Sequence, residues 1–231
     1  MEAAKHIIGI DKVKIGDVLL CVMKGRMAEK VELKTGSKYT HAGICYSEDE
    51  VVDMTLDGIQ KTKLSEFVAD TDHVAVFRNP YIWSEDRNKE LQTFLDNAIT
   101  QGIKYDKRGV YTFTDRKATH QWSVHEKLLK FFEEGLQPDD HRKPKYVCSE
   151  LIVASLIEIG VIDPSAAVLY KPDTYSTGDL SHDPTFGYFV GYLTPGTNDQ
   201  VPDDDEFANG FTFSELIEAA KGMVSRPQLQ Q

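Results

Sequence analysis

One cysteine in this sequence stands where a nucleophile could be made. Cys148 lies in the polar hexapeptide Tyr146-Val147-Cys148-Ser149-Glu150-Leu151, which leads into the apolar run from Ile152 to Ile159. A cysteine at that junction would occupy the first turn of a buried helix, where unpaired backbone N–H groups and the positive end of the helix dipole favour the thiolate. The alternative is a small core side chain, because free cysteine is among the most buried residue types.

A cysteine nucleophile needs a base within hydrogen-bond reach and a third group that orients this base. Of the seven histidines, His41 is the candidate base, since it lies in a compact strand beside the small residues Ala42 and Gly43. Cys45 is too far along that strand to be its partner, because four residues of strand span about 13 Å. Cys148 can be brought to His41 by folding. The alternative for His41 is a strand-edge histidine without a catalytic role.

Asp53, in the following strand, is the candidate for the orienting group. In an antiparallel hairpin that turns near Glu48, Thr55 lies opposite His41, and Asp53 is the diagonal neighbour of His41 on the same face. A four-residue turn would shift the register by one residue and send Asp53 to the other face. The parity of the hairpin therefore favours Asp53 without fixing it.

The elements that must position these residues predict an α+β fold. Short apolar runs bounded by turn residues predict strands at residues 16–22, 39–46, 51–55, 59–63, 74–78 and 186–192. Apolar residues at helical spacing predict helices over residues 84–102, after residue 148 and near 213–223, and a further helix around 128–132 that ends at Gly135. The polar stretch 24–38 fits either a loop or a short helix.

Composition indicates a soluble globular protein with one substantial core. The chain has 231 residues, of which 41% are hydrophobic and 27% charged. No apolar stretch approaches the roughly 18 residues of a membrane span, and residues 1–10 lack the apolar core of a signal peptide, so we expect a cytoplasmic protein. The net charge of −11, without a basic stripe interleaved with aromatic residues, disfavours nucleic-acid binding.

The three cysteines have no spacing typical of a disulfide framework or a structural zinc site. Cys21 and Cys45 are best explained as core side chains, which leaves Cys148 as the lone reactive thiol. We expect neither a metal nor a cofactor.

With these residues in place, the sequence resembles the permuted NlpC/p60 papain-like hydrolases of the YiiX type, with lecithin retinol acyltransferase as a more distant relative. The resemblance covers roughly residues 13–193 and rests on these motifs: Gly16-Asp17-Val18-Leu19, Thr40-His41-Ala42-Gly43-Ile44, the strand from Val51 to Thr55, Leu64-Ser65-Glu66-Phe67, Tyr105-Asp106 and the hexapeptide around Cys148. The order of the motifs is its specific part, because permuted members carry the histidine before the cysteine.

The resemblance implies a circularly permuted papain-like fold, in which the helix carrying Cys148 packs against a small antiparallel sheet or barrel that bears His41. By position, Cys148 matches the nucleophile, His41 the base and Asp53 the polar third residue. YiiX-like members often carry Glu in this third position and the acyltransferases His, so Asp is a departure. Tyr146 matches an aromatic position of the motif, and Tyr146 and Ser149 are candidates for substrate binding or oxyanion support.

For the organisation of the chain, we expect a catalytic domain over residues 1–193 with an insertion at about 107–144. An acidic, solvated linker and a short C-terminal helix would follow over residues 194–231.

The implied chemistry is acyl transfer through a thioester on Cys148. We expect a cysteine amidase or peptidase that acts on a peptide, an amide or an acyl ester of a small molecule. One alternative is a lipid acyltransferase or thioesterase with the same dyad, whose acyl site would be lined by aromatic residues of the segment 105–132. The other is a papain-like binding module that has lost turnover.

Overall fold

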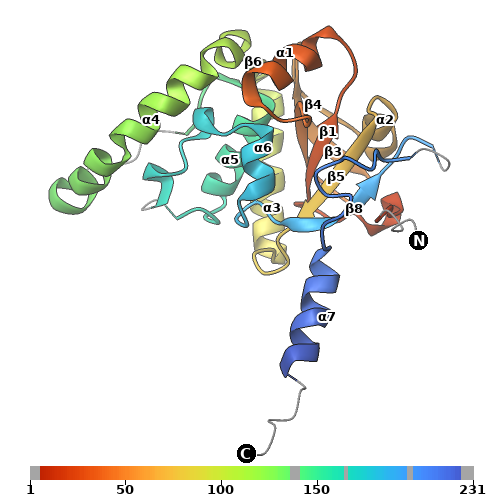
Figure 1. Cartoon of the computed structure of the whole chain (residues 1–231). Coiled ribbons are helices and arrows are strands. Elements are labelled where there is room, and N and C mark those ends of the chain that lie inside the picture. Colours follow the sequence, from red (N-terminus) through yellow and green to blue (C-terminus); the bar gives the residue numbers. More distant parts are fainter. Residues whose placement is uncertain (1–5, 136–140, 164–165, 197–199, 225–231) are drawn as a thin grey trace, which may run out of the picture.

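An antiparallel sheet of six strands forms the centre of this α+β structure (Figure 1). The order across the sheet is β4 (Gly58–Lys63), β3 (Glu50–Thr55), β2 (His41–Cys45), β1 (Val18–Val22), β5 (His73–Arg78) and β8 (Tyr188–Leu193). The computed structural model describes residues 6–135, 141–163, 166–196 and 200–224. Every strand expected from the sequence is present, with small differences at the ends.

Both faces of the sheet are covered, which explains why its central strands are almost continuously apolar. Val18, Leu20 and Ile44 belong to a large core cluster shared with the helices α3 (Glu85–Thr100) and α5 (Cys148–Glu158). Their neighbours along the strands, among them Cys21 and Cys45, belong to a second cluster that includes side chains of the helix α2 (Leu64–Ala69). Cys21 and Cys45 are fully buried, so their interpretation as core side chains is confirmed.

Most helices lie around this sheet, and the C-terminal helix extends away from it (Figure 1). They are α1 (Arg26–Thr35), α2 (Leu64–Ala69), α3 (Glu85–Thr100), α4 (Lys107–Glu134), α5 (Cys148–Glu158), α6 (Thr177–His182) and α7 (Phe213–Val224), with short 3-10 turns at Ile10–Lys12, Ala166–Val168 and Pro172–Thr174. The undecided stretch 24–38 therefore contains a helix. None of the described helices is long and apolar enough to cross a membrane.

The helix α5 is the most buried of these elements, and it packs against β2 and β3. Every side chain from Cys148 to Leu156 is buried, which matches the apolar run that predicted the helix. The short strand β7 (Lys145–Tyr146) leads into it and pairs in parallel with β6 (Lys104–Tyr105), which precedes α4. The nucleophile candidate is thus held by a rigid core element.

The expected insertion at 107–144 contains one long helix, α4, which begins earlier than the helix predicted around 128–132. Only Gly109, Phe113 and His120 are buried along its length, whereas Tyr111, Trp122 and Phe132 are exposed. So few buried side chains leave a weak periodic signal in the sequence, which explains why the start of the helix was not predicted.

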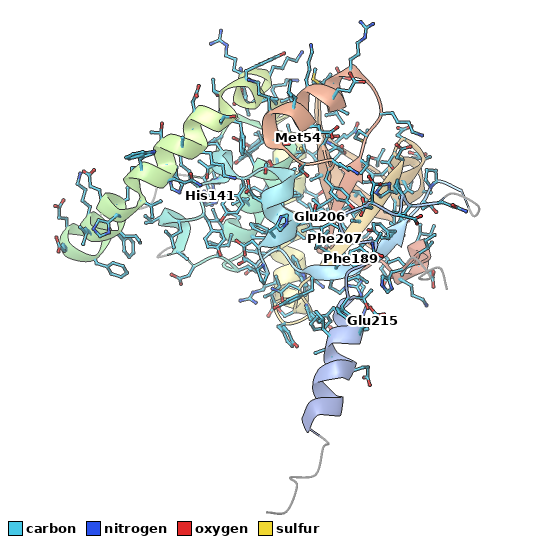
Figure 2. The ribbon with its side chains drawn as sticks, viewed as in Figure 1. Met54, His141, Phe189, Glu206, Phe207 and Glu215 are labelled. Atoms are coloured by element: carbon cyan, nitrogen blue, oxygen red, sulfur yellow. The ribbon has the colours of Figure 1, made fainter. Side chains whose placement is uncertain are left out.

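The acidic segment after β8 packs onto the domain, and this differs from the solvated linker that the sequence predicts. Val201 and Ala208 are buried, and the ring of Phe207 stacks on Phe189 of β8 with centroids 5.3 Å apart (Figure 2). The side chain of Asp205 is only 1% exposed. Its carboxylate accepts hydrogen bonds from the Tyr39 hydroxyl (2.9 Å), His73 Nε2 (3.0 Å), the Tyr192 hydroxyl and the Phe207 backbone N–H (3.1 Å). These donors compensate for the loss of hydration, which allows Asp205 to be buried.

Candidate active site

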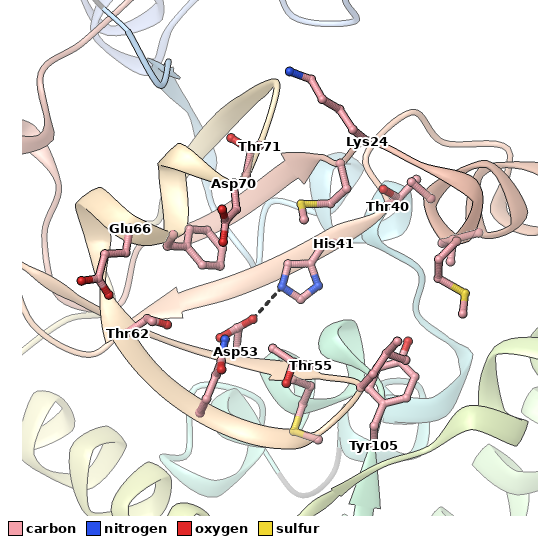
Figure 3. A pocket seen from close by; sticks show the side chains of 18 residues that line it. Lys24, Thr40, His41, Asp53, Thr55, Thr62, Glu66, Asp70, Thr71 and Tyr105 are labelled. Carbon is pink, nitrogen blue, oxygen red and sulfur yellow. Dashed lines mark hydrogen bonds and ion pairs between the residues drawn. The ribbon is translucent and has the colours of Figure 1, made fainter.

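The hairpin of β2 and β3 has the register that the sequence predicts. Gly43 pairs with Asp53 and Cys45 with Val51, which puts His41 opposite Thr55 and Asp53 diagonal to His41 on the same face. The Nε2 atom of His41 donates to the Oδ2 atom of Asp53 over 2.8 Å (Figure 3). The Asp53 side chain is 2% exposed, so this hydrogen bond is shielded from water.

The small residue Gly43 makes room for the aromatic ring that packs on His41. A Cβ atom at Gly43 would lie 2.7 Å from Cγ1 of Val51 and 3.0 Å from Cζ of Phe67, both too close. The Phe67 ring, from α2, has its centroid 5.9 Å from that of the His41 imidazole. Glycine at this position therefore lets Phe67 support the imidazole from the side.

Cys148 is the first residue of α5 and is 8% exposed. Val147 before it is extended, and its backbone N–H donates to the Glu150 carboxylate over 2.9 Å. The first N–H groups of a helix have no acceptor within the helix, and they carry the positive end of its dipole. The sulfur is thus held where negative charge is favoured.

Cys148 and Asp53 both act on the charge of the His41 ring. Burial by itself lowers the pKa of His41, but the hydrogen bond to Asp53 and the nearby Cys148 sulfur, together with the negative charges of both groups, outweigh this effect and raise the pKa to about 10. Because Nε2 is taken by Asp53, Nδ1 is the ring nitrogen left for the thiol. A protonated imidazole can then donate in both directions.

The other two thiols have no such surroundings. Burial raises the pKa of Cys21 and of Cys45 well above the ordinary value, and nearby negative groups add to the effect at both. Both side chains are fully buried in the core. They therefore stay protonated, which leaves Cys148 as the candidate nucleophile.

A pocket of about 450 Å³ opens beside His41 and Asp53, which both line it (Figure 3). Apolar side chains of the β1–α1 region, of β3 and of α2 form much of its wall, among them Met23, Met27, Val31, Met54 and Phe67. Such a mostly apolar cleft with a few polar groups is typical of a small-molecule or side-chain binding site.

Tyr105 also lines this pocket, although sequence patterns predict no role for it beyond its place in the Tyr105-Asp106 motif. Tyr105 pairs with Tyr146 between β6 and β7, which brings it close to the start of α5. Burial, followed by the negative charges of Cys148 and Glu150, raises the pKa of Tyr105 above its usual range. Its hydroxyl therefore keeps its proton and can donate. A pairing of two two-residue strands leaves no periodic signal, so the sequence could not show this placement.

The hydroxyls of Tyr146 and Ser149 make backbone contacts. The Tyr146 hydroxyl donates to the His141 carbonyl over 2.8 Å and accepts from the Lys143 N–H over 3.0 Å. The Ser149 hydroxyl donates to the Tyr175 carbonyl over 2.7 Å. Neither is among the described residues that line the pocket. Their expected part in substrate binding or oxyanion support stays a prediction. Because the Ser149 hydroxyl is already engaged, the group of Ser149 that could support an oxyanion is its backbone N–H.

A charged network supports the first turn of α5 from the side of α4. Glu150 is buried, and its Oε1 atom lies 3.5 Å from Nη1 of Arg116. The same Arg116 nitrogen is 3.5 Å from the Asp173 carboxylate, which also pairs with Lys143 at 3.1 Å. Sequence reasoning missed this network because its members come from segments that are far apart in the chain.

Within the described parts of the chain, no group of three His, Cys, Asp or Glu side chains is arranged to hold a metal ion.

No protein-family model and no curated protein matches this sequence. Among solved structures, the chain is similar to the crystal structure of the metalloprotein YiiX from Escherichia coli O157:H7. The two are 16% identical, with a TM-score of 0.44 over 64% of this chain and 67% of that chain. The function proposed below rests on this chain's own residues.

Proposed function

We propose that this protein is a papain-like cysteine hydrolase that cleaves an amide bond through a thioester on Cys148. The observation that carries the proposal is the series Cys148–His41–Asp53, in which an imidazole hydrogen-bonded to a buried carboxylate lies near enough to the Cys148 sulfur for that sulfur to raise its pKa. The packing of α5 against β2 and β3, with the histidine strand earlier in the chain, supports a permuted papain-like fold.

In the first step, the Cys148 sulfur attacks the carbonyl carbon of the substrate while the thiol proton resides on Nδ1 of His41. The carbonyl oxygen becomes an oxyanion. The candidate donors to it are the backbone N–H groups at the start of α5, beside the sulfur, and the hydroxyl of Tyr105, which lines the pocket.

In the second step, the C–N bond breaks and the His41 imidazolium gives its proton to the leaving amine. The acyl group is then held as a thioester. Neutral His41 next takes a proton from water, whose oxygen attacks the thioester carbonyl. The carboxylic acid leaves, the Cys148 sulfur is released from the thioester, and His41 again carries the proton it held before the first step. The net reaction therefore consumes one water for each amide.

Asp53 acts through His41. Its carboxylate fixes the ring orientation by accepting from Nε2 and stabilises the positive charge that the ring carries whenever it is doubly protonated. Because the Asp53 side chain is only 2% exposed, water screens the attraction between its carboxylate and the His41 imidazolium only weakly.

Amide hydrolysis is preferred over lipid acyl transfer because the aromatic residues expected to line an acyl site lie elsewhere. Tyr111, Trp122 and Phe132 are exposed on α4 at 60%, 90% and 76%, and of the aromatic residues from 105 to 132 only Tyr105 is among the described pocket-lining residues. A thiol that lies near a carboxylate-paired imidazole supports turnover over a binding module without it.

The proposal is tested by trapping the thioester. The protein is mixed with panels of short peptide amides and of acyl esters, quenched in acid, and the mass of the peptide containing Cys148 is measured. We expect acyl adducts on Cys148 from amides together with release of the amine, and neither in Cys148→Ala. Adducts from esters alone, with no amine released from any amide, would overturn amide hydrolysis in favour of acyl transfer.

A further inference from the structure

Flexible apolar side chains form one side of the pocket beside His41. Met23, Met27 and Val31 contribute from the β1–α1 region, and Met54 and Leu56 from the end of β3 and the turn after it. Met27 and Leu56 are 47% and 48% exposed, so apolar surface continues to the opening. Methionine is unbranched and polarizable, and it adapts to alkyl chains of varied shape. This wall therefore suits an alkyl chain.

Two carboxylates line the same pocket, from α2 and the residue after it (Figure 3). Glu66 and Asp70 are four residues apart, a spacing at which like charges on a helix repel. Asp70 also stands at the C-terminal end of α2, where the helix dipole disfavours an anion. Among the described residues, neither carboxylate has an ion-pair or hydrogen-bond partner. Local structure thus gains nothing from this pair of acids.

The other charges around the pocket are already matched. The Lys24 ammonium lies 2.7 Å from the carboxylate of Asp72, and in Figure 3 it points away from His41. His41 and Asp53 pair with each other. The charge left uncompensated in the pocket is therefore negative and comes from Glu66 and Asp70.

Buried polar atoms in the pocket wall point to a polar ligand independently of the acids. Thr40 Oγ1, Asp53 Oδ1 and Thr62 Oγ1 are buried and have no hydrogen-bond partner among the described residues. All three residues line this pocket. Thr40 is 8% exposed and the Asp53 side chain 2%. Buried polar atoms without a partner are rare, and N–H groups of a ligand would satisfy them.

We propose that this pocket selects a substrate in which a flexible alkyl chain carries a primary ammonium group, as in a lysine side chain beside the amide bond. The inference rests on the proposed function, because it names the substrate class of the same site. The alkyl chain lies along the methionine wall, the ammonium faces Glu66 and Asp70, and amide N–H groups of the substrate reach the polar atoms near Asp53.

Glu66 and Asp70 are exposed, so their effect on affinity is moderate and sensitive to salt. A neutral chain of equal length keeps the apolar contact and loses the ion pair. An acidic chain meets repulsion. The expected order of affinity is therefore lysine, then norleucine, then glutamate.

The test uses three matched probes: the N-acetyl methylamides of lysine, norleucine and glutamate. The lysine in its probe is flanked by an amide on either side, so both positions relative to the cleaved bond are covered. Binding is measured on Cys148→Ala by NMR titration at low and high salt. We expect the lysine probe to bind about 3- to 10-fold more tightly than the norleucine probe at low salt, with the difference shrinking at high salt.

The double variant Glu66→Gln/Asp70→Asn, in the Cys148→Ala background, should lose this preference. Glu48→Gln, which removes one exposed charge in the β2–β3 turn, should retain it. Equal binding of the lysine and norleucine probes, or binding of neither, would overturn the substrate class. Turnover by the wild-type chain is followed separately by mass. A lysine preference in binding without any turnover would overturn the hydrolase function and leave the substrate class standing.

Discussion

His41 and Asp53 are joined across one β-hairpin by a hydrogen bond of 2.8 Å between Nε2 and Oδ2. The hairpin register alone places them on the same face, and burial of Asp53 keeps water from competing. This pair fixes which ring nitrogen faces Cys148, so it sets both the orientation and the charge of the base.

The pH dependence of activity should follow His41. Its pKa is raised to about 10, so the imidazolium needed to protonate the leaving group is present at neutral pH and is lost only as the pH rises through about 10. In Asp53→Asn, one cause of the raised pKa is removed, and the alkaline limb of kcat/KM should move to lower pH. Asp49→Asn, an exposed acid in the β2–β3 turn, serves as the control. An alkaline limb at the same pH in the wild type and in Asp53→Asn would contradict the role of Asp53.

Tyr105→Phe should lower kcat by about 10- to 100-fold, because the pocket loses a hydroxyl donor to the oxyanion. The rate of Cys148 alkylation should stay nearly unchanged, since the dyad is intact. Tyr111→Phe, on the exposed part of α4, is the matched control. If Tyr105→Phe retains full kcat, the hydroxyl has no part in the reaction.

Gly43→Ala should destabilise the fold by about 1–3 kcal/mol and weaken the support of the His41 ring, since the new methyl group meets Val51 and Phe67. The double variant Gly43→Ala/Val51→Ala removes the nearer of the two contacts. Denaturant unfolding of both single variants and the double variant gives the coupling energy. Additive free energies of unfolding would mean that the clash is relieved in another way.

Asp205→Asn should lower the free energy of unfolding at pH 7 by about 2 kcal/mol or more. Burial alone would raise the pKa of Asp205, but hydrogen bonds from His73, Tyr192 and other donors lower it to about 2. A carboxylate whose folded pKa is depressed stabilises the fold above its unfolded pKa of about 4 and loses that contribution as the pH falls through 2. The difference in the free energy of unfolding between the wild type and Asp205→Asn should therefore shrink as the pH falls from about 4 to about 2. Asp203→Asn, an exposed neighbour, should unfold like the wild type.

The sequence was sufficient for the hairpin and for α5, because both depend on local rules. Side chains alternate with period two in a strand, so the positions of His41 and Asp53 follow once the turn is centred near Glu48. The apolar run after Cys148 likewise predicts a buried helix, and all its residues to Leu156 are buried.

The C-terminal segment and Tyr105 were beyond sequence reasoning, because their places depend on distant partners. An acidic run such as Asp203-Asp204-Asp205 normally indicates a solvated stretch. Asp205 is buried only because donors from Tyr39, His73 and Tyr192 converge on it, and these residues come from three separate parts of the chain. The pairing of Tyr105 with Tyr146 is equally long in range.

Alkylation by iodoacetamide across pH, followed for each cysteine by peptide mass, is the most direct test of an activated Cys148. An ordinary thiol is less than about 1% thiolate at pH 6. The nearby His41 imidazolium and the start of α5 should let Cys148 react at least about 10-fold faster than Cys21 and Cys45 near pH 6, and His41→Ala should remove much of this advantage. If Cys148 reacts no faster than Cys21 and Cys45 at that pH, the thiol is not activated and the proposed mechanism is wrong.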